Sequence, residues 1–390
     1  MNVSNIYNAS KITLGLMIGT SAAFAPTALY ADVSQQPLSL TEGVAPNLLV
    51  TLDDSGSMGR AYTPDSISNR STRRAGRSSS FNASYYDPNA IYAVPKKVTL
   101  LNSEVLVEDY PTPEFTNAYS DGFSQSGGRV DLSRDYRASW GSPTSYSNCP
   151  TGVNCNWWQE AEAHYFNYNI GPGCPASPVS DNDGCYSYVE VPTAQRTNFA
   201  TWYSFYRTRS LATRSAANLA FYSLPDNVRL TWGALNTCGI GSDTGGSCFR
   251  NSIQTFSGNH RVNFFDWLSD LPNNGGTPLH RAMQRAGNFL ISDPDAYKDD
   301  SGSEFTCRAS YHILMSDGTW NGRPNGNTNN DGGLEYPYKD DQTNTLADSA
   351  YYYWSTDLRP NLENKVPTYI PFQNANTTAQ YNDPRNNPAS

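Results

Sequence analysis

The fold of this chain is decided by one stretch near its start, Asn47-Leu48-Leu49-Val50-Thr51-Leu52-Asp53-Asp54-Ser55-Gly56-Ser57-Met58. The first part of it, Leu48 to Leu52, is a nearly unbroken apolar run, which is typical of a central parallel strand buried on both faces. The run ends at Asp53, and the glycines that follow favour a tight turn. Oxygen-bearing side chains alternate along this turn at Asp53, Ser55 and Ser57, so all three can point to one side. Oxygens that converge at the carboxyl end of a parallel strand suit a hard divalent cation.

Two later stretches place further oxygens in comparable positions. The first is a glycine-rich loop that enters a helix, Asn273-Asn274-Gly275-Gly276-Thr277-Pro278-Leu279. Pro278 suits the first helical position, where its missing N–H costs nothing, so Thr277 is expected at the helix N-terminus with its hydroxyl free. The second is His312-Ile313-Leu314-Met315-Ser316-Asp317-Gly318, an apolar run that predicts another buried strand, ending in Asp-Gly.

Together these segments resemble a von Willebrand factor A domain with its metal-ion-dependent adhesion site. The resemblance rests on a D-x-S-x-S motif at Asp53, Ser55 and Ser57, the threonine of G-G-T-P-L at Thr277, and the aspartate of D-G at Asp317. It implies a doubly wound, mostly parallel α/β sheet, with a metal held by these five residues. Mg²⁺ is the expected ion, and Ca²⁺ or Mn²⁺ are alternatives. Because few carboxylates neutralise the ion, an open position would attract an acidic side chain of a partner.

Other interpretations of these residues are weaker. The aspartates could merely cap turns at the strand ends. A phosphatase is disfavoured because Ser55 stands where the D-x-D nucleophile pattern needs its second aspartate. Gly56-Ser57-Met58-Gly59 lacks the G-x-S-x-G spacing of a nucleophile elbow. Zinc is disfavoured because there is no C-x-x-C and the four histidines are scattered. Asp54 points the other way along the strand and is not expected to be a ligand. We therefore expect a binding protein and not an enzyme.

Composition and the first residues indicate an exported protein. The formal net charge is −9 and no Lys/Arg run occurs, which argues against a nucleic-acid partner. Lys11 followed by an apolar run and small residues predicts a signal peptide over residues 1–31, which leaves 32–390 as the mature chain. A membrane anchor is the alternative, which Pro26 and the short apolar core disfavour. No later segment is apolar over enough residues to span a bilayer.

Export favours disulfides among the seven cysteines. The simplest pairing is local and joins Cys149 to Cys155, Cys174 to Cys185, and Cys238 to Cys248. Cys307 is then left over, either free, paired outside this pattern, or awaiting a partner absent from this chain.

One domain over residues 32–390 is expected, interrupted by a loop-rich, disulfide-containing insertion at residues 60–196 that includes a basic, Ser-rich stretch at 68–80. The remaining pattern predicts a helix at 198–221, a strand at 228–235, and helices at 264–271, 278–290 and near 345–358. Only three good core strands are found, whereas von Willebrand A domains have more strands after the Asp-Gly strand. We therefore expect a chain truncated at its carboxyl end. Asn327 to Gly332 resembles the start of a calcium loop, but Tyr338 replaces the bidentate glutamate of an EF-hand.

A narrower resemblance is to the PilY family, the tip-associated adhesins and assembly factors of bacterial type IV pili. It is carried by Tyr85-Tyr86-Asp87-Pro88-Asn89, by Asn198-Phe199-Ala200-Thr201-Trp202-Tyr203-Ser204-Phe205-Tyr206-Arg207-Thr208-Arg209, and by the strand ending in Asp317-Gly318. It implies export through the periplasm to the cell surface, pilus tip or outer membrane, with pilin or minor pilins as partners.

The same resemblance implies roles in pilus assembly, surface adhesion and twitching motility. The resemblance implies that the family continues into a calcium-binding β-propeller. We do not expect that region within these residues, so calcium-regulated retraction is not expected of this chain alone. The alternative is a secreted von Willebrand A-like adhesin for a host or matrix ligand, unrelated to pili.

Overall fold

The computed structural model describes residues 44–70, 73–137, 162–236, 252–299, 301–318, 320–322, 329–332, 340–363 and 365–366, all within one compact unit, Leu40–Ser390. The strands are β1 (Asn47–Leu52), β2 (Lys96–Leu101), β3 (Glu104–Asp109), β4 (Ala118–Tyr119), β5 (Arg129–Val130), β6 (His164–Tyr168), β7 (Tyr186–Glu190), β8 (Arg229–Ala234), β9 (Gln254–Thr255) and β10 (Ser310–Met315). The helices are α1 (Arg196–Phe205), α2 (Arg209–Phe221), α3 (Gly258–Ser269), α4 (Leu279–Ser292) and α5 (Leu346–Ser355), with short 3₁₀ turns η1 (Gly56–Gly59), η2 (Asp65–Arg70), η3 (Ala75–Arg77), η4 (Asp183–Cys185) and η5 (Thr193–Gln195).

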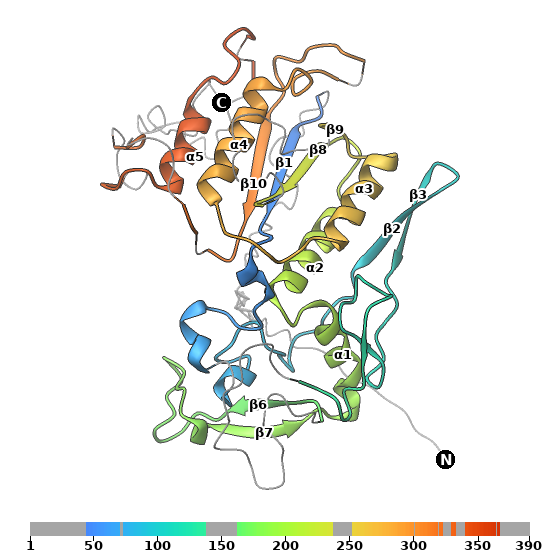
Figure 1. Cartoon of the computed structure of the whole chain (residues 1–390), viewed down its shortest axis with the longest axis vertical. Helices are drawn as coiled ribbons and strands as arrows, with labels where there is room; N and C mark the ends of the chain where they lie inside the picture. The colour runs from blue at the N-terminus through green and yellow to red at the C-terminus, as the bar shows by residue number, and fades with distance from the viewer. Residues whose placement is uncertain are drawn as a thin grey trace, which may run out of the picture. The chain divides into compact units, whose positions relative to one another are not determined.

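The main sheet has the order β10-β1-β8-β9 (Figure 1). β1 runs parallel to both neighbours, with Leu52 opposite Met315 of β10 and opposite Ala234 of β8. β9 is a short antiparallel addition to β8. The predicted central strand and the predicted strand at 228–235 are therefore confirmed, as is a mixed α/β architecture built on parallel strands.

Helices pack on both faces of β1, because alternate side chains of a strand point to opposite sides. Val50 and Leu52 belong to one apolar core with residues of α2, α3 and β8. Leu49 belongs to a second core with residues of α4 and the segment after it. Figure 1 shows α4 and α5 beside β10, and α2 and α3 on the side of β8. The finer assignment, a doubly wound von Willebrand A-like fold, stays a prediction.

The prediction that the Asp-Gly strand is buried is wrong. Among the described strands, β10 pairs only with β1, so it forms an edge of the sheet. Its side chains alternate between partly buried and exposed, and Tyr311 and Ile313 are each 40% exposed. The apolar run identified the strand correctly but could not show that one side of it lacks a neighbouring strand among the described residues.

The single helix predicted over 198–221 is also wrong, because the chain breaks it into α1 and α2. Thr208 adopts an extended conformation, and its hydroxyl accepts a hydrogen bond from the Leu211 N–H at 3.2 Å, which starts a new helix. Asn198 does not cap a helix. Its side chain instead accepts from the Tyr92 N–H and donates to the Ala90 carbonyl, which ties α1 to the insertion.

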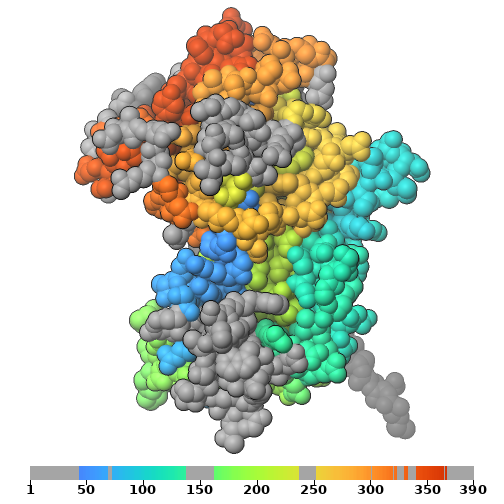
Figure 2. All heavy atoms as spheres, viewed as in Figure 1, coloured from blue at the N-terminus to red at the C-terminus, as the bar shows by residue number. Residues whose placement is uncertain are grey.

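The insertion at residues 60–196 shares an aromatic core with α1. Tyr86 is fully buried and its ring contacts those of Tyr92, Tyr165, Phe199 and Trp202, so the insertion packs directly on α1. The β2–β3 hairpin contacts α3 and projects beyond it, as Figure 1 and the cyan atoms of Figure 2 show. The basic, Ser-rich stretch at 68–80 contains the turn η3, where the Arg77 side chain is buried.

One predicted disulfide is confirmed: Cys174 and Cys185 are bonded and close the connection between β6 and β7. Cys307 carries a free thiol and is partly buried. The other four cysteines, the predicted signal peptide, and residues 327–328 and 333–338 around the calcium-loop-like stretch lie outside the described residues.

Candidate metal site

Three distant segments meet at the carboxyl edge of the parallel strands. The Asp53 N–H continues the sheet by donating to the Met315 carbonyl at 2.9 Å, and the Ser316 hydroxyl donates to Oδ2 of Asp53 at 2.7 Å. The Gly56 N–H donates to the Gly275 carbonyl at 3.1 Å, so the glycine-rich loop lies against the turn after β1. The structure thus brings the three predicted segments together, because all of them follow or face the ends of adjacent strands.

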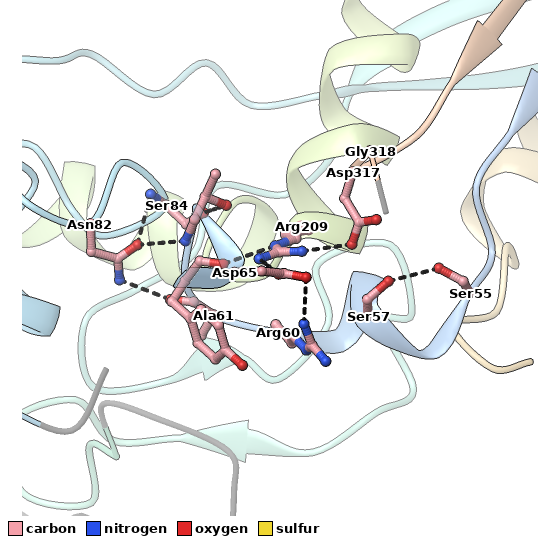
Figure 3. A network of polar contacts seen from close by, with 12 residues as sticks. Ser55, Ser57, Arg60, Ala61, Asp65, Asn82, Ser84, Arg209, Asp317 and Gly318 are labelled. Atoms are coloured by element: carbon pink, nitrogen blue, oxygen red, sulfur yellow. Dashed lines mark hydrogen bonds and ion pairs between the residues drawn. The ribbon is translucent and has the colours of Figure 1, made fainter. Parts of the chain in front are cut away.

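The two serines of the first segment lie side by side. Oδ1 of Asp53 accepts the Ser55 N–H at 2.7 Å, which folds the turn back on itself. The hydroxyl oxygens of Ser55 and Ser57 are 2.9 Å apart and share a hydrogen bond (Figure 3). Neighbouring ligands of an octahedral Mg²⁺ ion are also about 2.9 Å apart, since each lies about 2.1 Å from the ion. This pair of oxygens could therefore accept a cation without rearrangement.

The glycine-rich loop is held by asparagines that the motif analysis missed. Gly275 has φ +98°, and a Cβ there would lie 2.8 Å from Cγ of Asn236. The Asn236 amide donates to the Gly276 carbonyl and to Oδ1 of Asp54, both at 2.7 Å. Burial raises the pKa of Asp54, and its hydrogen bonds from Asn236 partly oppose that shift. Asp54 thus anchors the loop through Asn236.

Thr277 lies at the end of this loop and is 4% exposed. Its N–H donates to Oδ1 of Asn321, and Pro278 comes between it and α4, which begins at Leu279. Pro278 is therefore the residue before the helix and not its first residue, one position from the prediction. Asn236 comes two residues after β8, so a polar residue just past a predicted strand end is the signal that could have found it. Asn321 comes six residues after β10, and the sequence offers no comparable signal for it.

Asp317 is the fifth predicted ligand, and its carboxylate is held by an arginine. Nη1 of Arg209 donates to Oδ2 of Asp317 at 2.6 Å, and the two side chains are only 7% and 6% exposed (Figure 3). Oδ1 of Asp317 is buried and has no hydrogen-bond partner in the part of the chain that the structure describes. A buried carboxylate oxygen without a donor is costly, and a cation would remove that cost.

Comparison with known proteins finds relatives of high sequence identity that match nearly the whole chain. The chain is 50% identical over 393 residues to the "Type IV pilus biogenesis factor PilY1" of Pseudomonas aeruginosa strain UCBPP-PA14, a match that covers 98% of this chain. It is 46% identical over 414 residues to the protein of the same name in strain PAK, with 99% of this chain covered. The chain belongs to the PilY family.

This PilY-family chain spans about a third of the length of the curated relatives that it matches, 33% and 35% for those two. No family model matches it, and no solved structure matches it. The narrower of the two resemblances drawn from the sequence is therefore confirmed, whereas the wider one, to von Willebrand A domains, stays a prediction.

Arg209 joins the site of this PilY-family chain to the insertion. Its Nε donates to the Tyr62 carbonyl at 2.8 Å, and its Nη2 forms an ion pair with Asp65. Asp65 also pairs with Arg60 at 2.8 Å. Burial raises the pKa of Asp65, but hydrogen bonds from Arg209 and Arg60 outweigh burial and leave this pKa below its ordinary value. Arg209 is the last residue of the PilY-like stretch 198–209, but nothing in that pattern placed it at this site.

The side chains around the site fit a hard cation by their chemistry. The turn after β1 contributes one carboxylate and two neighbouring hydroxyls, and Asp317 contributes a carboxylate whose Oδ1 is buried and has no donor among the described residues. The described residues contain no group of three or more His, Cys, Asp and Glu side chains that could hold a metal. In the same part of the chain, no helix is long and apolar enough to cross a membrane.

Proposed function

We propose that this PilY-family chain is the ligand-binding part of an exported, type IV pilus-associated protein. It acts in pilus assembly, surface adhesion and twitching motility by binding and not by catalysis. The printed name of its relatives, a type IV pilus biogenesis factor, supports the pilus association. The Cys174–Cys185 disulfide supports export, because disulfides persist in oxidising compartments. The predicted signal peptide at 1–31 would carry it through the periplasm to the cell surface, pilus tip or outer membrane.

A divalent cation is central to this proposal. The observation that carries it is the buried Oδ1 of Asp317, which has no hydrogen-bond partner among the described residues, together with the paired hydroxyls of Ser55 and Ser57. Asp53, Ser55, Ser57, Thr277 and Asp317 would hold the ion in a von Willebrand A-like site. Mg²⁺ is favoured because hydroxyls and few carboxylates, completed by waters, suit its coordination. Ca²⁺ and Mn²⁺ are alternatives.

The bound ion would supply a charge bridge to a partner. With only two carboxylates in the predicted ligand set, the ion retains positive character and attracts an acidic side chain. The partner is then a protein that presents an exposed Asp or Glu, with pilin or minor pilins at the tip as first candidates and a host surface protein as the next. A chain of net charge −9 would otherwise repel such a ligand.

Calorimetric titration with MgCl₂ and MnCl₂ tests the metal site. Wild type is expected to bind one ion, and Asp53→Ala is expected to weaken binding by more than about 100-fold, since even the loss of an outer partner of a metal ligand costs about 10- to 100-fold. The chain offers a matched control in Asp299, which has the same D-x-S-x-S spacing with Ser301 and Ser303 in a surface turn. Asp299→Ala should bind as wild type does. Equal affinities of wild type and Asp53→Ala would remove Asp53 from the site.

A further inference from the structure

Arg209 is a buried cation placed directly against a predicted metal ligand. It is the first residue of α2, and its backbone N–H donates to the Arg60 carbonyl at 3.0 Å. Its guanidinium uses one nitrogen on Asp317, one on the Tyr62 carbonyl and one on Asp65. Figure 3 shows this guanidinium between the two carboxylates, with Ser57 on the far side of Asp317. A positive side chain is unexpected beside a site whose other groups suit a dication.

The charges around this guanidinium divide into two sets. On the site side lies Asp317, which binds Arg209 through Oδ2 and whose Oδ1 has no partner in the described part of the chain. On the insertion side lies Asp65, the first residue of η2, whose side chain is 35% exposed and which also pairs with Arg60. Arg209 is therefore shared between a carboxylate that a cation needs and a carboxylate that belongs to the insertion.

We propose that Arg209 is an internal counter-ion that competes with the divalent cation for Asp317, and that Asp65 sets the strength of this competition. The proposal rests on the metal site of the proposed function. Without the ion, Arg209 neutralises Asp317 and keeps the edge of the sheet stable. With the ion, two positive groups share one buried carboxylate, which lowers the affinity for the ion. The insertion thereby regulates metal occupancy through one side chain.

Asp65 acts in the opposite direction from Arg209. The negative charge of Asp65 compensates part of the positive charge of the guanidinium and so weakens the repulsion between Arg209 and the ion. Removal of Asp65 leaves Arg209 to Asp317 alone, which strengthens the competing ion pair. A change that moves η2 away from α2 would have the same effect. Two substitutions only a few atoms apart should therefore shift metal affinity in opposite directions, which a general loss of structure cannot do.

The test is titration of purified protein with MgCl₂ and MnCl₂ in the variants Arg209→Gln and Asp65→Asn. Arg209→Gln should tighten binding by at least about tenfold, and Asp65→Asn should weaken it by about threefold or more, because a unit charge is removed close to the ion in each. Thermal unfolding without metal, measured alongside, shows whether each variant is folded. Asp65 is partly exposed, so Asp65→Asn carries the test alone if Arg209→Gln does not fold.

Arg214→Gln is the matched control. Arg214 is equally buried in α2 and also pairs with a carboxylate of the insertion, Asp121 at 2.5 Å, but its described partners include none of the predicted metal ligands. Its metal affinity should equal that of wild type. Unchanged or weaker binding in Arg209→Gln overturns the proposal, as does tighter or unchanged binding in Asp65→Asn. If wild type binds, Asp53→Ala does not, and Arg209→Gln equals wild type, only the competition is refuted. If neither wild type nor Arg209→Gln binds metal, the metal site is refuted as well.

Discussion

Buried arginines provide much of the internal polar structure of this chain at the scale of single residues. Eight arginines in the described residues are under 9% exposed, and they are Arg77, Arg207, Arg209, Arg214, Arg229, Arg261, Arg285 and Arg308. A guanidinium stays charged, so each one must be satisfied by hydrogen bonds. Arg229, for example, donates to the carbonyls of Ile253 and Ala296 and so joins β8 to two loops. These charges in turn dictate the protonation of their neighbours.

His164 is the clearest case, because it is 2% exposed and faces Arg77. Nη1 of Arg77 donates to Nε2 of His164 at 2.9 Å, so Nε2 must be the unprotonated nitrogen, and Nδ1–H donates to the Glu162 carbonyl. Burial, together with the charge of Arg77, lowers the pKa of His164 to about 3. The imidazole is thus held neutral in the folded protein.

This depressed pKa predicts loss of stability in acid. Below the ordinary pKa of about 6.5, His164 binds a proton in the unfolded chain but stays neutral in the folded chain. The contribution of His164 to the free energy of unfolding is therefore complete above pH 6.5 and declines as the pH falls toward 3. The slope is at most about 1.4 kcal/mol per pH unit. Urea unfolding of wild type and His164→Asn at pH 7 and pH 5 should show a steeper decline in wild type. Parallel pH profiles would contradict it.

Close helix contacts and helix ends decide the structure at the scale of elements. α1 ends at Phe205 and Thr208 caps the start of α2, although the apolar pattern runs through both helices. Thr345 and Asp348 form a reciprocal capping box at the start of α5, which defines that helix locally. α5 then packs against α4 through Gly287, where an added Cβ would lie 2.0 Å from the ring of Tyr353. The close packing of α5 on α4 therefore depends on the absence of a side chain at Gly287.

Gly287→Ala is expected to lower the free energy of unfolding by about 1–2 kcal/mol. Alanine alone would stabilise a helix by about 1 kcal/mol, but overpacking against Tyr353 costs more than that. Guanidinium unfolding measures the difference. Gly171→Ala is the control, because a Cβ there meets nothing within 4 Å, and it should be neutral. A stabilised Gly287→Ala would show that α5 moves away at little cost.

The insertion returns to the sheet at the scale of the whole molecule. Residues 60–65 lead away from the candidate site, but Arg209 contacts them and so connects the start of the insertion to the site. The aromatic cluster around Tyr86 packs another part of the insertion against α1. The insertion is therefore a folded part of the same unit and not a loop attached to its rim. A partner bound to the insertion and a cation bound at the sheet edge would affect one another through this connection.

Deletion of the gene for this protein is expected to abolish or strongly reduce surface pili and twitching, if the proposed pilus function holds. Electron microscopy of pili and a twitching-zone assay measure the two effects. Complementation with the Asp53→Ala form, compared with Asp299→Ala, shows whether the metal site contributes. Normal piliation together with lost surface attachment would favour the alternative of a secreted adhesin unrelated to pili.

The amino-acid sequence by itself determined the central strand, its parallel neighbour at 228–235, the confirmed disulfide and the family. Each of these follows from a local sequence pattern: an apolar run that stops at a carboxylate, two cysteines in one short loop, or motif residues a few positions apart. The same local patterns also placed Asp53, Ser55, Ser57, Thr277 and Asp317 at ends of elements, which is why their segments could be expected to meet.

Only the tertiary structure decided which residues surround these five. Arg209 and Asp317 are 108 positions apart, and Asn236 and Asp54 are 182 apart. Their contacts exist because strand pairing brings distant chain segments to one edge, and no local periodicity records such a pairing. The exposure of β10 has the same origin, since an apolar strand looks alike in sequence whether it has one neighbour or two. Local energetics specify elements, whereas burial and charge pairing between distant segments specify the site.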